Sequence, residues 1–481
     1  MLLGFVLAYW IVSVAIGIWA ALRVRTTADF AVAGRMLPFH IVLATVFATW
    51  FGSEAVLGIP ATFIKEGLAG IVADPFGASL CLILFGLFLA KPLYRMKLLT
   101  IGDYYRKRFG RIVEVLTALA IVASYLGWVG AQIQALGLVF NVVSGGSISQ
   151  TWGMWIGCLS ILVYTLFGGM WSVAITDFIQ MIVIVIGMLY ISYGIAGQVG
   201  GVAPVIQHAS EAGKLTFFPD GMSIVAVIGF VAALCTMMLG SMPQQDVYQR
   251  VTSSKNETIA VWATVIGGTL YFCFTFTPLF LGYSATLIDP ALVEKYIESD
   301  SQQILPQLVL QHAPLFAQIL FFGALLSAIK SCASATLLAP SVSFAENILR
   351  PMLPPLSDKQ TLRLMQVVVL CFTALVMAYS LSTNATIYEM VENAYSVTLV
   401  TAFVPLVFGL FWKRATRQGA LAAIFAGFIV WIACQAFASE AAVPPQLAGL
   451  LAGLAGMIIG SLAPQRIPDL TERERGEPLA V

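Results

Sequence analysis

Residues 48–63 read ATWFGSEAVLGIPATF, and residues 238–250 read MLGSMPQQDVYQR. Each stretch interrupts an apolar segment with glycine, proline and polar residues: Gly52 and Pro60 lie in the first, and Pro243 lies in the second. Glycine and proline release backbone groups that lipid cannot satisfy, so each stretch predicts a helix that is broken inside a membrane. Broken helices at matching positions of two repeats indicate the binding site of a transporter.

The composition is that of a chain that lies within a lipid bilayer. Hydrophobic residues make up 59% of the chain, charged residues 10%, and the mean hydropathy is +0.90, whereas soluble domains are about 25% charged. The apolar runs are continuous, which favours helices over the alternating segments of a β-barrel. The net charge of +1 gives no sign of a nucleic-acid partner, and no feature indicates an obligatory protein partner. The sequence predicts an all-α, multi-pass integral membrane protein.

Thirteen apolar segments are long enough to cross the bilayer. Their connections are short, so we expect residues 1–465 to form one transmembrane domain and residues 466–481 to form a short cytoplasmic tail. The predicted segments are 2–22, 38–64, 71–91, 112–143, 150–168, 174–198, 220–245, 257–284, 314–348, 361–382, 387–411, 416–437 and 446–463.

The two broken segments are the second and the seventh in this order. A separation of five fits a five-helix unit that occurs twice in inverted orientation. We expect the repeats over about residues 38–198 and 220–411, with one extra helix before them and two after them.

The basic residues predict the orientation. If the N-terminus lies outside, 21 of the 25 Lys and Arg residues fall in cytoplasmic loops, and only Lys65, Lys214 and Lys295 fall outside. Lys and Arg concentrate in cytoplasmic loops, so we expect the N-terminus outside and the C-terminus in the cytoplasm. Short loops and a compact chain favour a bacterial inner membrane.

Lys330 is the one basic residue deep inside an apolar segment. A charge at the bilayer centre costs at least about 2.5–3.5 kcal/mol and usually marks a path for ions or substrates. Three interpretations remain open. The ammonium takes the place of a sodium ion, anchored by Glu54 or Asp177, and gains and loses a proton during transport; or it binds an anionic group of the substrate; or it forms a static salt bridge.

Several blocks of the chain resemble the sodium:solute symporter family. They include GIWAALRVRTTADFAVAGRMLP, GGMWSVAITDFIQ, PQQDVYQR and SAIKSCASATLLAPSVSFAENIL, and the similarity covers about residues 14–415. The choline-transporter-like branch is the most similar. The resemblance implies the LeuT-type 5+5 inverted repeat, alternating access, and solute uptake that is usually coupled to Na⁺.

The resemblance also implies a sodium site. Carried over residue by residue, its backbone carbonyls fall at Ala48, Phe51 and Ala328, and its hydroxyl positions fall at Ser331 and Cys332. Cys332 departs from the family, because a thiol is a weak ligand for a hard cation. The alternative role of the Ser331 hydroxyl is a hydrogen bond to its own helix.

Two more family positions bear on ion coupling. Asp177 matches an acidic position that holds or relays a cation, although a carboxylate near the start of a helix also fits a plain helix-terminus charge. Lys330 replaces an uncharged residue. We therefore expect coupling to Na⁺ or, if the ammonium substitutes for sodium, to H⁺, and in that case Lys330→Met strengthens Na⁺ dependence. No enzymatic cofactor is expected.

For the substrate, Trp50 and Trp128 fall at aromatic positions where rings face a quaternary ammonium in the choline-type branch. The alternative role of these rings is packing or anchoring at the membrane interface. A third ring position is occupied by Gln244, which weakens the case for choline itself.

Acidic residues near these rings are candidates to compensate a cationic substrate or Lys330. Glu54 lies in the first broken helix and Asp74 lies in VADPFG. Asp246 lies two residues after Gln244. Its position near the cytoplasmic edge favours a solvated loop charge over a role in compensating a cation.

Taken together, the residues and the resemblance predict a secondary active, cation-coupled symporter of a small polar organic solute. A proton-coupled or ion-independent transporter is the alternative within this class, and a transporter-like solute sensor is the alternative outside it. No nucleophile–base pair, metal motif or phosphate loop suggests an enzyme.

Overall fold

The computed structural model describes residues 1–218, 221, 223–438 and 442–470. Within these residues the chain is helical and contains no strand. Part of the predicted cytoplasmic tail, residues 471–481, lies outside the described residues, as do positions 220 and 222 at the start of the seventh predicted segment.

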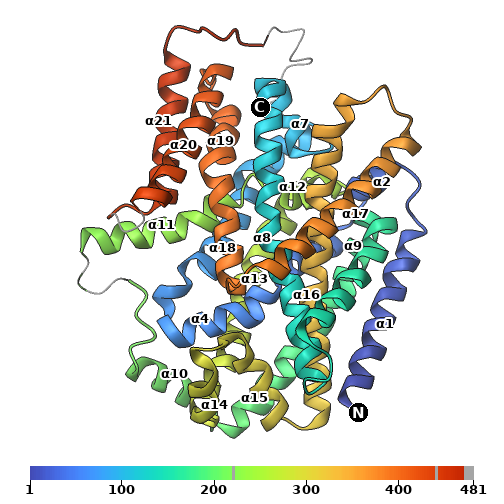
Figure 1. Cartoon of the computed structure of the whole chain (residues 1–481), viewed down its shortest axis with the longest axis vertical. Coiled ribbons are helices and arrows are strands. Elements are labelled where there is room, and N and C mark those ends of the chain that lie inside the picture. The colour runs from blue at the N-terminus through green and yellow to red at the C-terminus, as the bar shows by residue number, and fades with distance from the viewer. Residues whose placement is uncertain (219–220, 222, 439–441, 471–481) are drawn as a thin grey trace.

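Ten described helices are long and apolar enough to cross a membrane, or up to twelve if each of two bent pairs is one span. Several of them run along the long axis of the molecule (Figure 1). The ten spans are Leu2–Ala21, Leu68–Arg95, Arg111–Val143, Gln150–Gln198, Glu257–Ile288, Leu315–Met352, Asp358–Ser382, Ile387–Phe411, Arg417–Phe437 and Pro445–Leu462.

Within these spans the individual α-helices are α1 (Leu2–Ala21), α5 (Ala78–Leu84), α6 (Ala90–Arg95), α8 (Arg111–Val143), α9 (Gln150–Gln198), α13 (Glu257–Ile288), α16 (Leu315–Ser343), α17 (Asp358–Ser382), α18 (Ile387–Thr398), α19 (Val404–Phe411), α20 (Arg417–Phe437) and α21 (Pro445–Leu462).

The two stretches that open the sequence analysis are bent helix pairs. α3 (Phe39–Trp50) meets η2 and α4 (Glu54–Gly58 and Ile59–Glu66) at 53°, and α11 (Ile224–Gly240) meets α12 (Gln245–Ser253) at 44°. The predicted breaks are therefore confirmed at Gly52 and Pro243, whereas Pro60 lies in the first turn of α4.

α9 is the one place where the helix count differs from the sequence interpretation. The sequence divides this region into 150–168 and 174–198, and the structure describes one element of 49 residues whose backbone leaves helical geometry at Gly169 (φ 45°, ψ −141°). At about 1.5 Å per residue, an unbroken helix of this length would be more than twice as long as a bilayer core is thick.

Shorter helices lie at the two ends of the bundle. α10 (Val202–Glu211), α14 (Pro290–Ile297) and α15 (Ile304–His312) lie at the same end as the N-terminus, and α2 (Thr27–Val32) and α7 (Ile101–Phe109) lie at the opposite end (Figure 1).

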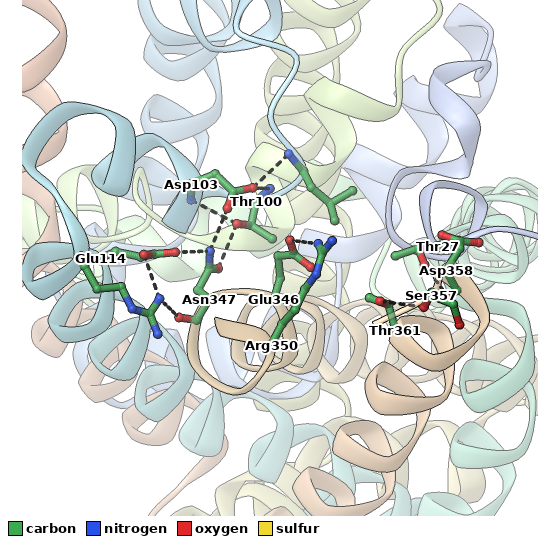
Figure 2. Close-up of polar contacts among 12 residues, drawn as sticks. Thr27, Thr100, Asp103, Glu114, Glu346, Asn347, Arg350, Ser357, Asp358 and Thr361 are labelled. Atoms are coloured by element: carbon green, nitrogen blue, oxygen red, sulfur yellow. Dashed lines mark hydrogen bonds and ion pairs between the residues drawn. The ribbon is translucent and has the colours of Figure 1, made fainter. Parts of the chain in front are cut away.

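A buried polar cluster fixes η8 (Phe344–Leu349), which continues α16, at the α7 side of the molecule (Figure 2). The Asn347 amide donates to Asp103 Oδ1 and Glu114 Oε1, both at 3.0 Å, and accepts from the Thr100 hydroxyl at 2.9 Å. Asn347 and Glu114 are fully buried. Because the hydrogen bonds of this amide are made, the cluster holds η8 firmly against α7 and α8.

Candidate functional site

Five buried aromatic rings from four helices form a cluster beside the breaks. We call Trp50, Tyr125, Trp128, Tyr271 and Tyr395 the aromatic cluster; each is at most 2% exposed. Trp128 is the centre, with its ring centroid 5.7 Å from that of Trp50, 5.4 Å from Tyr395 and 5.9 Å from Tyr125. Trp50 also stacks on Tyr395 at 6.2 Å and meets Tyr271 at 6.5 Å. The structure thus brings together the two tryptophans that the sequence predicts.

Each of three buried carboxylates accepts a hydrogen bond from one ring of the aromatic cluster. Trp128 Nε1 donates to Glu54 at 3.3 Å, and Tyr271 Oη donates to Asp74 at 2.5 Å. Tyr125 Oη donates to Asp246 at 2.5 Å. Among the described residues none of these three carboxylates forms an ion pair.

Glu54 lies where the first bent pair meets α8 and α16. Gln132 Nε2 donates to Glu54 Oε2 at 2.7 Å, and the Cys332 thiol lies 4.0 Å from Oε1. The Gln132 carbonyl oxygen accepts from the backbone N–H of Ser53 at 2.9 Å, so one side chain of α8 satisfies both a freed backbone group and the carboxylate. This contact explains how the break is tolerated away from water.

Asp246 and Arg250 correct two sequence predictions. The expectation of a solvated loop charge at Asp246 is wrong, because this residue is fully buried, and Arg250, which was counted among the cytoplasmic loop residues, is 1% exposed. The reason is that α12 packs along its whole length against the bundle. The Arg250 guanidinium donates to the Thr49 hydroxyl and to the backbone carbonyl of Asp246, both at 2.9 Å.

The predicted ion-site residues lie on three elements that contact one another, α3, α9 and α16. Ser331 Oγ donates to Asp177 Oδ1 at 2.5 Å, and the Thr45 hydroxyl donates to Oδ2 of the same carboxylate. Asp177 is fully buried within α9. Ala48 and Phe51 lie at the end of α3, where a helix leaves carbonyl groups without intrahelical partners. Ala328 and Cys332 lie one turn apart on α16, next to Ser331.

Lys330 points away from these carboxylates. Its ammonium donates to the Ser13 hydroxyl of α1 at 2.9 Å and lies 5.8 Å from the Trp10 ring and 5.7 Å from the Tyr164 ring. In the described part of the chain it forms no ion pair. The structure therefore does not bring Lys330 to Glu54 or to Asp177, and the ammonium bonds to Ser13 instead of forming the salt bridge that one of the three interpretations holds.

Gln244 faces hydroxyl groups rather than the centre of the aromatic cluster. Its amide nitrogen donates to Ser124 at 2.9 Å and to Thr398 at 3.3 Å. Thr398 also donates to the carbonyl of Gly240 at 2.7 Å, so this amide helps to hold the second break against α8 and α18.

Sequence reasoning missed five residues of the site: Tyr125, Gln132, Arg250, Tyr271 and Tyr395. A signal existed for two of them, because residues three or four apart share a helix face and 125, 128 and 132 therefore lie on one side of α8. Tyr271 and Tyr395 reach the site from distant segments, and no local pattern marks them.

Two broken helices that enclose buried polar and aromatic side chains within a membrane bundle define a secondary transporter. The chain belongs to the sodium:solute symporter family, whose family model matches residues 30–427. It is a transporter and not an enzyme.

Comparison with individual proteins agrees with this membership. The chain is 28% identical to the high affinity choline transporter 1 of Homo sapiens, over 89% of this chain and 75% of that protein. It is 24% identical to the sodium/pantothenate symporter of Escherichia coli (strain K12), over 95% and 96% respectively. The structure of a Na⁺-coupled sialic acid symporter superposes with a TM-score of 0.82 at 20% identity, covering 96% of this chain and 98% of that chain. The fold is therefore shared with that symporter.

Proposed function

We propose that the protein is a Na⁺-coupled symporter that carries a small, positively charged organic solute across the membrane by alternating access. The observation that carries this proposal is the aromatic cluster with a buried carboxylate bonded to each of three of its rings. Aromatic faces attract ammonium groups, and carboxylates buried without an ion pair are costly unless a cation joins them.

The count of charges supports a cationic cargo. Glu54, Asp74, Asp177 and Asp246 are all buried, and the buried cations of the described residues in this part of the bundle are Arg250 and Lys330, the latter bonded to Ser13. A bound Na⁺ next to Asp177 and a cationic solute next to the aromatic cluster would compensate this excess of acid.

We propose Na⁺ rather than H⁺ as the coupling ion, at a site formed by the carbonyls of Ala48, Phe51 and Ala328 with the Ser331 hydroxyl. The Asp177 carboxylate accepts a hydrogen bond from the Ser331 hydroxyl at 2.5 Å and so adds a negative charge next to this site. Cys332 occupies the second side-chain position and lies 4.0 Å from Glu54 Oε1; in this proposal it lies between the ion site and the solute site.

We also propose thirteen spans, with α9 divided at Gly169, in the LeuT-type 5+5 arrangement with repeats over about 38–198 and 220–411. The two bent pairs then occupy matching positions. Lys65, Lys214 and Lys295 lie in or next to α4, α10 and α14, and α10 and α14 lie at the end of the molecule where α1 begins (Figure 1). This supports an external N-terminus, and a bacterial inner membrane is our proposal for the location.

Uptake into proteoliposomes tests the proposal. With an inward Na⁺ gradient we expect concentrative uptake of labelled small amines or quaternary ammonium compounds, and little uptake when K⁺ replaces Na⁺. Binding of such a solute without any flux would instead support the sensor alternative. Uptake driven by a pH gradient in the absence of Na⁺ would contradict the choice of coupling ion.

Replacing Lys330 with Met tests whether its ammonium lies at the ion site or away from it, next to Ser13. Because the ammonium bonds to Ser13 on α1 and not to Asp177 or Glu54, we expect the Na⁺ concentration for half-maximal uptake to change by less than about threefold. A neighbouring ammonium 4 Å from the ion would instead repel it by about 4 kcal/mol at an effective dielectric of 20. A gain in apparent Na⁺ affinity of more than about tenfold in Lys330→Met would show that the ammonium does occupy or screen the ion site.

Gly52→Ala is expected to reduce uptake at least about tenfold. A Cβ at Gly52 would lie 2.8 Å from Cys332 Sγ and 2.7 Å from Glu54 Oε2, so the first break must move away from α16. Gly323→Ala in the same α16 is the matched control, since its Cβ meets nothing within 4 Å. Initial rates normalised to reconstituted protein give the comparison, and equal rates for the two variants would show that this close approach is unimportant.

A further inference from the structure

Among the described residues, several buried polar atoms in and beside the aromatic cluster form no hydrogen bond of full geometry. They are Asp246 Oδ2, Trp50 Nε1, Tyr395 Oη and Ser241 Oγ. The first is an acceptor, the second is a donor, and the two hydroxyls act as either. Buried polar groups are rarely left unpaired, so this combination indicates a ligand that both donates and accepts hydrogen bonds.

These atoms are carried by groups that contact one another. Trp50 stacks on Tyr395, and Asp246 is linked through Tyr125 to Trp128, which touches both of those rings. Ser241 follows Gly240, whose Cα lies so near Tyr395 that an added Cβ would be 2.4 Å from the Tyr395 carbonyl oxygen. The groups that carry the unpaired atoms thus pack together at the second break.

Asp246 is the anchor of this region. Its Oδ1 is already occupied by the Tyr125 hydroxyl, and its backbone N–H donates to the same oxygen of Tyr125 at 2.8 Å. Arg250 bonds to the backbone carbonyl of Asp246 and not to the carboxylate. The carboxylate is therefore held in one orientation. Its Oδ2 faces the Trp50 indole without a hydrogen bond of full geometry, so an N–H or O–H donor on a ligand would pair with it.

We propose that Asp246 binds the ammonium group of a small protonated amine that retains at least one N–H and carries a nearby oxygen acceptor, as in an amino alcohol. This inference rests on the proposed function and narrows its substrate class. The N–H satisfies Asp246 Oδ2, and the oxygen of the solute accepts from Trp50 Nε1 or Tyr395 Oη. The ring faces of Trp50 and Tyr395 cover the remaining surface of the ammonium.

A fully substituted ammonium fits this arrangement poorly. It has no N–H, so it would bury Asp246 Oδ2 against methyl groups with no donor from the ligand, which a site built to hydrogen-bond its ligand discriminates against strongly. The amide of Gln244, bonded to Ser124 and Thr398, also gives this side of the site no aromatic face.

A methylation series tests the inference on the purified full-length protein. Equilibrium binding of ethanolamine, N-methylethanolamine, N,N-dimethylethanolamine and choline is measured at pH 7 in saturating Na⁺. The first three keep an N–H when protonated, and choline does not. We expect the first three to bind within about tenfold of one another and choline to bind at least about 30-fold more weakly than the dimethyl compound.

Two variants locate the effect. In Asp246→Asn the difference in affinity between the dimethyl compound and choline is expected to shrink to less than about threefold. Glu294 is an exposed acid of α14, and Glu294→Gln is expected to keep the full difference in affinity. A difference in affinity that persists in Asp246→Asn overturns the assignment to this residue. Should Asp246→Asn fail to fold, the wild-type series still decides whether the site requires an N–H on the ammonium.

The outcomes separate the two proposals. If wild-type protein binds choline as tightly as the dimethyl compound, or more tightly, the inference is overturned and the proposed function stands. If none of the four cations binds, the proposal of a cationic solute fails, and the inference fails with it.

Discussion

Glu54→Gln is expected to weaken binding of the transported cation by about 10- to 100-fold and to lower uptake at subsaturating solute by the same factor. Glu54 accepts from Gln132 Nε2 at 2.7 Å and from Trp128 Nε1 at 3.3 Å. An amide in its place removes the negative charge and turns one acceptor into a donor that faces another donor. Loss of a buried charge-assisted hydrogen bond costs about 1.5–3 kcal/mol, and each 1.4 kcal/mol is a factor of ten in affinity.

The measurement is the solute dependence of the initial uptake rate in proteoliposomes, with Glu294→Gln as the exposed control on α14. The double variant Glu54→Gln with Gln132→Glu restores a donor–acceptor pair with the charge moved onto α8, and we expect it to recover part of the lost affinity. If Glu54→Gln transports with unchanged half-saturation, the carboxylate contributes nothing to cation binding and serves only to hold the first break.

Asp177→Asn is expected to raise the Na⁺ concentration for half-maximal uptake at least about 30-fold, with a smaller effect on solute affinity at saturating Na⁺. Asp177 accepts hydrogen bonds from Ser331 and Thr45, so its charge lies directly behind the hydroxyl that we assign to the ion. Two unit charges of opposite sign 4 Å apart attract by about 4 kcal/mol at an effective dielectric of 20, and the variant loses much of this attraction.

Na⁺ titrations of uptake at fixed solute measure the change. Ser341→Ala is an informative comparison on α16. Among the described residues the Ser341 hydroxyl bonds to the carbonyl of Leu337 in its own helix, and its removal is expected to leave the Na⁺ dependence unchanged. An Asp177→Asn protein with normal Na⁺ dependence would show that the ion lies elsewhere. A variant that loses Na⁺ dependence but keeps solute binding would separate the ion site from the aromatic cluster.

Much of the fold was predictable because the bilayer constrains it strongly. Apolar length marks the spans, and Gly52 and Pro243 mark the breaks, since only such residues interrupt a helix in lipid. The pairing of Trp50 with Trp128 also followed from the resemblance. The number of spans at 150–198 was not settled by the same logic, because Gly169 breaks the helical geometry without ending the helical pattern on either side of it.

The site was only partly predictable, because it depends on how the helices are rotated and on contacts between distant segments. Lys330 and Ser331 are neighbours in sequence, yet adjacent residues on a helix point about 100° apart, so one meets Ser13 and the other meets Asp177. Asp246 and Arg250 looked like loop charges because α12 is polar, and only its packing buries them. Tyr271 and Tyr395 are ordinary apolar-segment residues until the bundle is assembled.

The polar cluster around Asn347 limits which helices can move during the transport cycle. It ties η8, the continuation of α16, to α7 and α8, so the helix that carries Ser331 and the helix that carries Trp128 are held together at this end. The rings of the aromatic cluster are all buried, so a solute reaches them only when helices move. We therefore expect the conformational change of the transport cycle to come from movement of the two bent pairs relative to α8 and α16, with Gly52 and Gly240 as the hinges.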